Sequence, residues 1–399
     1  MQDASARTRT SRWMWNAAAG IAVLYVGSTL LTPLYPLYER RFGFGELGVT
    51  EIYAIYVLGN LAVLFFFGRL SDQIGRRPVA LIALGITIAS ALCFLFAESE
   101  AWLFPARVLN GFAAGLGAGT MTAWIAELEP RGDRARAAAF ASAGNLAGLA
   151  LGALGAGLLA RFAPWPLRLS FVCFIGVLAG VIAMLMRAPE TIAKPVRSLR
   201  ELSLKPRIGV PRGIRVQFIA PAAMAFIAFA LGGFYAALVP GVLSRQIGVS
   251  DVGVIGGIVA LFFVSAAATV VATRALANRP ALYAASALVF AGLALLLAAD
   301  ALRSMALIVA ASLVGGAAMA LAYRSSLGIV NAIAPEDRRA ELVSSYLLVC
   351  YTANALPVIG VGLITGTIGA TNAHRVLAAV LAALALVACA VGARKLPRD

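Results

Sequence analysis

Apolar residues occur along this chain in long runs that are separated by short polar turns. One such turn, residues 68–78, lies between two apolar runs, 49–67 and 79–97. A run of about 19 residues forms a helix of roughly 30 Å, which is the thickness of the hydrocarbon layer of a membrane. The same pattern predicts twelve transmembrane helices, at residues 14–36, 49–67, 79–97, 101–126, 138–160, 166–187, 216–240, 252–272, 281–299, 304–326, 341–364 and 374–393.

The composition agrees with a polytopic membrane protein. Hydrophobic residues make up 61% of the chain and charged residues 13%, and the mean hydropathy is +0.89. The runs are too long, and too rich in Ala, Leu and Gly, to be the strands of a barrel, which alternate over about ten residues. The first run is also too long for a cleavable signal peptide and leads into further spans. We therefore predict an all-α membrane protein.

Basic residues predict the orientation of the chain. With the N-terminus inside, 25 of the 33 Lys and Arg residues fall on the cytoplasmic side and 7 on the other, and Arg107 lies within a span. Because basic loops accumulate on the cytoplasmic side, we expect both termini there and the chain in the inner membrane of a cell. The net charge of +15 is spread over these loops, where attraction to anionic lipids accounts for it without nucleic acid.

Residues 188–215 interrupt the hydropathy with four prolines and a series of basic residues. We interpret this stretch as a linker between two six-helix bundles, residues 1–187 and 216–399. The halves resemble each other, since residues 129–136 after the fourth span are similar to residues 334–339 after the tenth. A weaker similarity relates residues 76–78 to residues 278–280. Duplicated halves are typical of secondary transporters, in which the substrate binds near the midplane.

The turn at 68–78 carries a specific motif. It matches the pattern G-x-L-x-D-x-x-G-R-R at every position, with Gly68, Leu70, Asp72, Gly75, Arg76 and Arg77. On this motif the chain resembles the major facilitator superfamily over essentially its whole length, which implies two pseudo-symmetric six-helix bundles, alternating access and a monomer. The resemblance also implies that Glu127 pairs with Arg76 or Arg77. Such a charge cluster predicts a conformational latch; the alternative is that the arginines only fix the topology.

Arg107 is the clearest charge inside a predicted span. With Leu103, Asn110, Gly111 and Gly115 it resembles the fourth-helix motif of the family, built around R-x-x-Q-G, although Asn110 replaces the usual Gln. A guanidinium at membrane depth is costly unless it has a function or a partner, so we predict a role in proton coupling. The alternatives are that the side chain reaches the outer surface or bonds to a carbonyl for structural reasons.

Two glycine patterns resemble the drug:proton antiporter branch of the family. Gly27, Pro33 and Pro36 match G-x-x-x-x-x-P-x-x-P in the first span, and residues 189–191 (Pro-Glu-Thr) also look like the exporters. In the fifth span the antiporter motif is partial, because Leu149 and Ala153 depart from it; its matching residues are Gly144, Gly148 and Gly152. The alternative is a packing seam, because small residues four apart let two helices approach closely.

Acidic residues are scarce in the predicted spans, and the first span has none, unlike many multidrug members of the family. Glu51 is the predicted proton carrier, the alternative being that it caps the N-terminus of its helix. A cavity with Arg107 and without a deep carboxylate predicts neutral or anionic amphiphilic substrates rather than cations.

By resemblance, polar and aromatic residues of spans one, four, seven and ten, and of their neighbours, should line the substrate cavity. For any one of them ordinary helix packing is the alternative. The candidates are Tyr25, Thr29, Thr32, Tyr35, Tyr56, Asn60, Asn110, Thr120, Asn145, Phe229, Tyr235, Tyr323, Arg324, Tyr351 and Asn354.

Other chemistry is sparse. The four cysteines lie singly inside spans, and the one histidine, His374, is expected at the membrane interface, so we predict no metal site. We also predict no cofactor and no enzyme activity, since no phosphate-binding G-x-x-x-x-G-K is present. The interpretation is a secondary active transporter that exports small amphipathic compounds in exchange for protons. The alternatives are a proton-coupled symporter that imports an organic acid or other metabolite, and a sensor or scaffold that does not transport.

Overall fold

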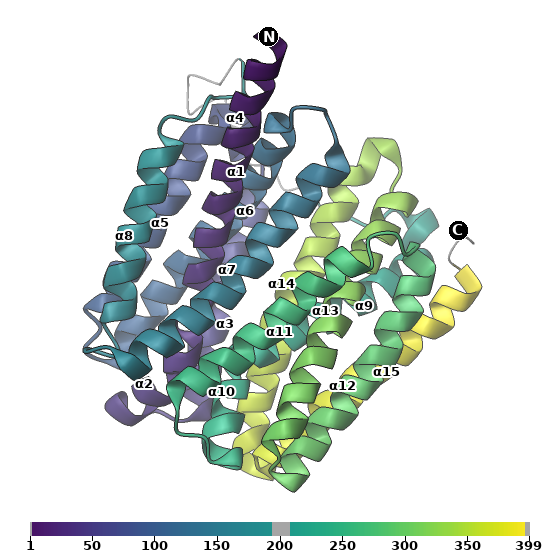
Figure 1. Cartoon of the computed structure of the whole chain (residues 1–399). Helices are drawn as coiled ribbons and strands as arrows, with labels where there is room; N and C mark the ends of the chain where they lie inside the picture. Colours follow the sequence, from purple (N-terminus) through teal and green to yellow (C-terminus); the bar gives the residue numbers. More distant parts are fainter. Residues whose placement is uncertain (1, 194–207, 396–399) are drawn as a thin grey trace. The chain divides into compact units, whose positions relative to one another are not determined.

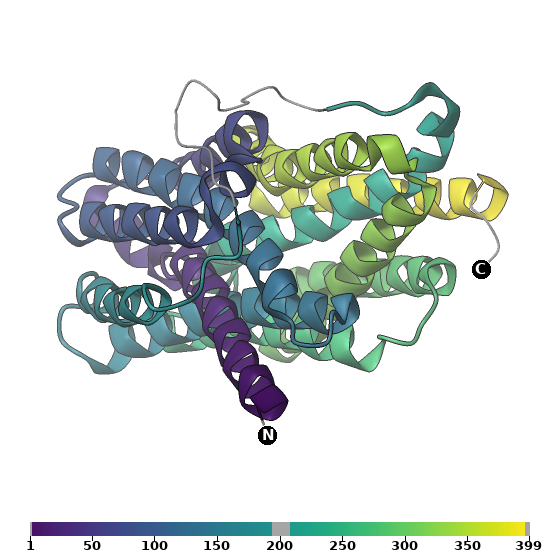
Figure 2. The ribbon, with the colours of Figure 1, turned by 90° about the horizontal axis from the view of Figure 1, so that it is seen from above.

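The computed structural model describes residues 2–193 and 208–395, and every regular element in this part of the chain is helical (Figures 1 and 2). Within these described residues, ten helices are long and apolar enough to cross a membrane. This confirms the prediction of an all-α membrane protein. Most of the predicted linker, residues 194–207, lies outside the described residues.

Two further helices coincide with predicted spans. α6 (Leu103–Leu128) has 26 residues, but its arginine, asparagine and glycines lower its hydropathy, and α8 (Leu169–Leu185) is apolar but has only 17 residues. Each of the twelve predicted segments therefore overlaps at least one α-helix. That all twelve cross the membrane, and that the halves are pseudo-symmetric, stay predictions.

The contacts divide the chain into two units. Unit 1 contains residues 1–31 and 58–206, and unit 2 contains residues 32–57 and 207–399. The end of the first predicted span and the start of the second thus belong to unit 2 by their contacts. That residues 1–187 and 216–399 form two six-helix bundles stays a prediction from the sequence.

Unit 1 is built from long helices that pack side by side (Figure 1). The bounds are α1 (Gln2–Thr29), the end of α3 (Glu46–Ala62), a π-helical turn η2 (Val63–Phe67), α4 (Leu70–Ile74), α5 (Arg76–Leu95), η3 (Glu100–Trp102), α6, α7 (Arg134–Phe162) and α8. Close packing of α1 on α6 is possible because Gly117 leaves room for Leu24, and Gly20 leaves room for Met121.

Unit 2 contains the start of α3 and the helices after the linker. The bounds are η1 (Thr32–Leu34), α2 (Tyr35–Phe42), η5 (Arg212–Ile214), α9 (Arg215–Ala237), α10 (Val239–Gly241), a π-helical turn η6 (Val242–Ile247), α11 (Val252–Ala272), α12 (Asn278–Leu302), α13 (Met305–Ile333), η7 (Glu336–Arg338), α14 (Arg339–Ile368) and α15 (Ala370–Lys395).

The first predicted span, 14–36, does not form one regular helix. α1 ends at Thr29, and the chain passes through η1 before α2 begins. Pro33 and Pro36 explain the interruption, because a proline cannot donate the backbone hydrogen bond that an α-helix requires and fits best in a first turn. α2 then ends at Gly43, whose left-handed φ of 78° reverses the chain toward α3.

His374 lies near the start of α15. It is 5% exposed and packs edge-on against Phe234, with ring centroids 5.4 Å apart. α15 thus directs this side chain toward α9, and its position at the membrane interface stays a prediction.

Candidate functional site

Arg76, the first residue of α5, is at the centre of a network of ion pairs in unit 1. Its side chain is 9% exposed. Nη2 and Nε donate to Glu127 at the end of α6, at 2.8 and 3.1 Å from Oε1, and Nη1 contacts Asp72 Oδ1 at 2.5 Å and Ser71 Oγ at 2.7 Å. Three elements, α4, α5 and α6, are thus joined by one guanidinium. This arrangement contains the Arg76, Glu127 and Asp72 grouping predicted for the latch.

Glu190 accepts hydrogen bonds from the backbone at the start of α5. Its Oε1 accepts from the backbone N–H of Arg76 at 2.9 Å, and its Oε2 accepts from that of Arg77 at 2.9 Å. A carboxylate at a helix N-terminus satisfies donors that have no partner within the helix and interacts favourably with the helix dipole. Glu190 therefore caps α5 from a residue more than a hundred positions away in the sequence.

The backbone hydrogen bonds also affect the ionisation of Glu190, which lies outside the membrane-spanning helices. Burial alone would raise the pKa of this carboxyl, but the backbone N–H groups of Ile192, Arg76, Arg77 and Thr191 all donate to it and lower the pKa. Together they outweigh burial, so the pKa is below its ordinary value and Glu190 is ionised at neutral pH.

Gly75 is required for this cap. Its φ is +110°, a conformation that residues with side chains rarely adopt, and a Cβ here would lie 2.6 Å from Glu190 Oε2. Gly68, the other glycine of the latch motif, has an ordinary helical φ of −58°. The second glycine of the motif is thus explained by the turn and by the carboxylate that approaches it.

The segment after α8 is held to this network by three further contacts. Thr191 Oγ1 donates to Glu127 Oε2, the buried Trp124 donates from Nε1 to the carbonyl of Pro189 at 3.1 Å, and Arg77 Nη1 donates to that of Ala188 at 3.3 Å. From the sequence, residues 189–191 (Pro-Glu-Thr) resembled the exporters of the family, but no chemical role could be assigned to them. Only the fold shows that residues 189–191 meet the 68–78 loop.

Arg107 lies inside α6 and is 1% exposed. Its Nη1 donates to the backbone carbonyl of Ser28, on α1, at 3.1 Å. Asn110 follows one turn later, is also buried, and lies beside Gly27, the glycine of the first-span motif. The structure thus brings the two motifs of α1 and α6 together, and it places a charge in the interior of unit 1, not at its surface.

The three glycines of the partial antiporter motif lie against α1. A Cβ at Gly144, Gly148 or Gly152 would lie 2.8, 2.2 or 2.4 Å from the nearest atom of α1. Thr29 reinforces this contact, since its Oγ1 donates to the carbonyl of Leu149 at 2.7 Å. The packing seam, which we gave as the alternative, is therefore real; a role in antiport stays a prediction.

The other cavity candidates in unit 1 are spread over several helices. Asn60, on α3, is buried and packs beside Gly115 of α6, and Thr120 Oγ1 donates to the carbonyl of Leu116 one turn away. Tyr25 packs beside Gly148, and Asn145 is half-buried on α7. Their roles as cavity residues stay predictions.

Unit 2 brings three of the predicted cavity residues into one aromatic cluster. Phe229 of α9 lies 5.7 Å from Tyr323 of α13 and 6.5 Å from Tyr351 of α14, centroid to centroid, in edge-on arrangements. Tyr346, which was not predicted, extends the cluster at 6.4 Å from Tyr323 and shares a 2.8 Å hydrogen bond with Ser326. The cluster offers apolar faces together with phenolic hydroxyls.

Residues of the first two predicted spans also reach this unit. Tyr53 donates to Asn354 Oδ1 at 3.0 Å, so Asn354 is bound by a residue that the sequence did not single out. Tyr56, Thr32 and Tyr35 are buried. Glu51, the predicted proton carrier, is exposed on α3.

Arg324 binds the end of a helix. Its guanidinium donates to the carbonyls of Leu276 and Arg274 (3.3 Å), beyond the C-terminus of α11, and contacts Thr273 Oγ1 at 3.5 Å. A positive charge at a helix C-terminus is favourable because it complements the helix dipole. This contact gives Arg324 a structural role beside the predicted one in the cavity.

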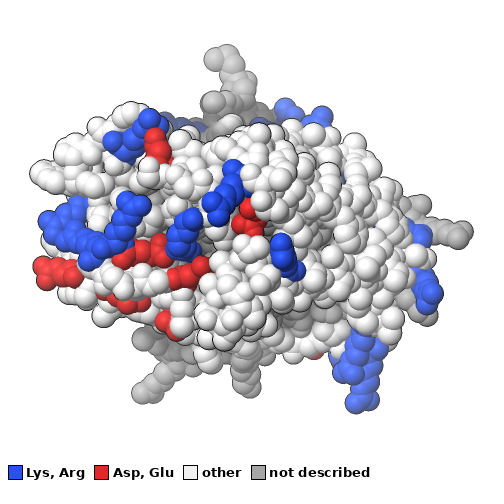
Figure 3. Space-filling model, turned by 90° about the horizontal axis from the view of Figure 1, so that it is seen from below, with Lys and Arg blue, Asp and Glu red and all other residues white. Residues whose placement is uncertain are grey.

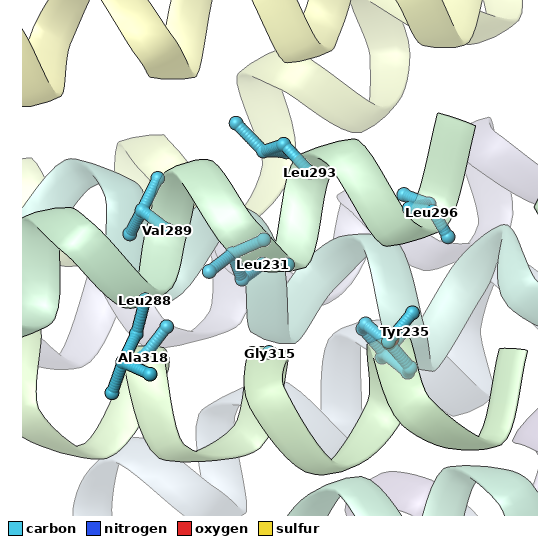
Figure 4. A pocket seen from close by; sticks show the side chains of 10 residues that line it. Leu231, Tyr235, Leu288, Val289, Leu293, Leu296, Gly315 and Ala318 are labelled. Atoms are coloured by element: carbon cyan, nitrogen blue, oxygen red, sulfur yellow. The ribbon is translucent and has the colours of Figure 1, made fainter. Parts of the chain in front are cut away.

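Tyr235 stacks on Phe262 of α11 at 3.9 Å and lines a small cavity between α9, α12 and α13 (Figure 4). The cavity has a volume of about 10 Å³, and Leu231, Val289 and Leu293 line it. A space of this size holds about one water molecule, and an apolar lining keeps it dry. It cannot hold a drug-sized compound.

The long apolar helices define the class of multi-pass membrane proteins. The family follows from a direct comparison: the family model described as Major Facilitator Superfamily matches residues 17–356, and the chain belongs to this family. Its members are transporters of small molecules and not enzymes.

Curated relatives include a quinolone resistance protein. The quinolone resistance protein NorA of Staphylococcus aureus strain MRSA252 is 27% identical over 217 residues, which are 54% of this chain and 54% of NorA. The uncharacterized MFS-type transporter Rv1250 of Mycobacterium tuberculosis is 28% identical over 178 residues, 44% of this chain and 30% of that protein. The alignments thus span about half the length of these relatives or less.

Proposed function

We propose that this chain is a secondary active transporter that exports small amphipathic compounds in exchange for protons by alternating access. The observation that carries the proposal is the Arg76 network. The buried guanidinium of Arg76 is bound by carboxylates from α4 and α6, and these ion pairs can break and form again together when the helices move. The direction of transport rests on the quinolone resistance relatives and on the glycine patterns of α1 and α7.

The arrangement in the membrane is part of this proposal. All twelve predicted segments cross the membrane, α6 and α8 included, in two six-helix bundles. Both termini lie in the cytoplasm and the protein works as a monomer in the cytoplasmic membrane. The distribution of basic residues supports the orientation, because it places the 68–78 loop and the linker inside.

Arg107 and Glu51 are the proposed residues for proton coupling. Arg107 is buried in unit 1 at the predicted depth of the membrane, and its Nη1 donates to the carbonyl of Ser28; a charge held at this depth supports a functional role. Glu51 is not enclosed by other helices and lies at the predicted outer end of its span, near the water from which a proton carrier takes up protons.

The substrate class follows from the side chains that unit 2 collects. The Phe229, Tyr323 and Tyr351 cluster supports binding of aromatic, amphipathic molecules. With Arg107 as the deep charge, neutral or anionic compounds are preferred over quaternary cations.

The test is proton movement in sealed proteoliposomes with an acidic lumen. Adding amphipathic compounds outside should release protons from the lumen, at a rate that a protonophore abolishes and that empty liposomes lack. Proton movement together with small carboxylates would establish symport and overturn the direction. A folded Arg107→Ala variant that retains coupled transport would overturn the role of Arg107.

A further inference from the structure

Arg245 joins two distant stretches of the chain within unit 2. Its Nη1 donates to Glu39 Oε1 at 2.7 Å, and its Nη2 donates to Glu46 Oε2 at 3.1 Å. The partners lie 206 and 199 positions earlier in the sequence, Glu39 on α2 and Glu46 at the start of α3. One guanidinium is thus divided between two carboxylates.

The two carboxylates are well enclosed although they lie near the ends of helices. Their side chains are 13% and 12% exposed, whereas that of Arg245 is 42% exposed. An ion pair with shielded carboxylates and two separate hydrogen bonds contributes more than an isolated pair at the surface. On the face that Figure 3 shows, acidic and basic side chains lie next to one another.

The backbone around Arg245 leaves room for the guanidinium. Arg245 lies in the π-helical turn η6, a local widening that is frequent at functional sites. A Cβ at Gly241, one turn earlier, would lie 2.1 Å from Nη2, so the guanidinium lies over the backbone of this glycine. Gly241 has an ordinary helical φ of −67°, and its missing side chain is therefore needed for space and not for the turn.

Residues 32–57 also touch the rest of unit 2 through uncharged groups. Tyr53 donates to Asn354, and Thr50 packs against Gly362, where a Cβ would lie 2.1 Å from Oγ1. In the described part of the chain, however, the ion pairs that join this stretch to residues 207–399 all pass through Arg245. They are the contacts between the two stretches that a change of protonation can break.

The balance of charge makes this contact sensitive to protons. Glu39 faces Arg245 and Glu46, with Arg40 as the further charge near it, and His374 of α15, beside Asp300, also lies within electrostatic reach of Arg245. With both carboxylates ionised, each holds one nitrogen of Arg245; protonating both leaves a guanidinium beside neutral acids. A groove of about 430 Å³, lined by Glu39, Glu46, Ser244 and Arg245 among others, gives water access to the group.

We propose that Arg245 is a latch that holds residues 32–57 against the rest of unit 2 while Glu39 and Glu46 are ionised, and that protonation of these carboxylates releases it. The proposal rests on the proposed function only for the place of this latch in the transport cycle. In that cycle, protons on the outer side would favour opening of the protein at the end where Arg245 lies. It is distinct from the Arg76 network, which belongs to unit 1.

The test measures the distance between spin labels at Leu47 and Ser250, both exposed, in a background without cysteine. As the pH falls from about 8 to about 5, where carboxylates begin to take up protons, the wild-type distribution should gain a longer component. In Arg245→Gln, and in the double variant Glu39→Gln with Glu46→Gln, that component should be present at both pH values. Arg375→Gln is the matched control, because Arg375 bonds to Asn372 on its own helix.

A second variant tests the latch without removing a charge. Gly241→Ala should displace the guanidinium and produce the longer component, as Arg245→Gln does. Gly257→Ala in α11 is its control, since a Cβ there meets nothing within 4 Å. A distribution that is unchanged by pH, by Arg245→Gln and by Gly241→Ala would overturn the proposal.

These measurements need no substrate and thus separate the two proposals. Labels that report opening at low pH, together with proteoliposomes that show no exchange of protons for amphiphiles, would leave the latch and overturn the proposed function. Coupled export by a protein whose labels never respond to pH would do the reverse.

Discussion

Replacing Glu127 should weaken the Arg76 network more than replacing Asp72, although Asp72 belongs to the loop motif and Glu127 is the partner predicted for it. In Glu127→Gln the amide keeps one oxygen, but its NH₂ group faces donors, namely the guanidinium and the hydroxyl of Thr191. In Asp72→Asn the remaining Glu127 still holds Nη2 and Nε of Arg76.

The burial of the partners gives the size of the two effects. Removing one partner of a fully buried ion pair costs about 3–5 kcal/mol, and an exposed pair contributes about 0.2–1 kcal/mol. The Glu127 side chain is 33% exposed and that of Asp72 is 51% exposed, while Arg76 is 9% exposed. We therefore expect a loss of about 2 kcal/mol for Glu127→Gln and of at most about 1 kcal/mol for Asp72→Asn.

The assay has two readings on the same purified proteins. Thermal unfolding in detergent measures the stability of the protein. Proton-coupled transport in proteoliposomes, normalised to the amount of folded protein, measures whether the Arg76 network works as a latch. A loss of about 2 kcal/mol from one conformation shifts a two-state equilibrium roughly thirtyfold, so Glu127→Gln should impair transport strongly. Asp72→Ala should impair transport more than it lowers the abundance of the protein. Glu98→Gln, an exposed carboxyl between α5 and η3, is the control.

Equal destabilisation by the two substitutions would refute the ranking by burial. Normal transport by well-folded Asp72→Ala and Glu127→Gln proteins would refute the proposal that the Arg76 network is a latch. Arg76 and Arg77 would then serve only to fix the topology.

Three further substitutions test other parts of unit 1. Glu190→Gln should lower the stability by about 1 kcal/mol. Because folding lowers the pKa of Glu190, its contribution to stability is present at neutral pH and is lost as the pH falls below about 4.5. The melting temperature of the wild type should therefore fall more steeply in acid than that of the variant. Gly148→Ala places a Cβ 2.2 Å from the carbonyl of Ala22 and should cost about 1–3 kcal/mol in thermal unfolding, whereas Gly155→Ala on the same helix meets open space and should cost nothing. Arg107→Lys should fold but lose coupling, measured as the number of protons released per substrate, because an ammonium on a different stem cannot reproduce the planar guanidinium against the carbonyl of Ser28.

The sequence predicted the helices well because each is an apolar run long enough to cross a membrane. The predicted segment 252–272 agrees with α11 residue for residue. The predictions were weaker where local chemistry matters more than hydropathy: the π-helical turns at 63–67 and 242–247 and the interruption before α2 do not alter the pattern of apolar residues.

The candidate site was predictable only where a motif marks it. Asp72 and Arg76 are close in sequence, and Glu127 followed by family resemblance. Glu190 was not recognised as a cap, because nothing in a Pro-Glu-Thr segment indicates which helix N-terminus it will meet. The partners of Arg245 could not be predicted for the same reason, since contacts between residues some 200 positions apart are set by the fold.

The contact of Trp124 with Pro189 gives this chain an internal optical reporter. Trp124 is completely buried, and its indole N–H bonds to the carbonyl next to Glu190, whereas Trp15, Trp102 and Trp165 are 59%, 44% and 69% exposed. Trp124 is therefore shielded by the protein where those three indoles are not. With the other tryptophans replaced by phenylalanine, emission from Trp124 would follow the 188–192 segment as it binds and leaves the end of α6, in real time and without an attached label.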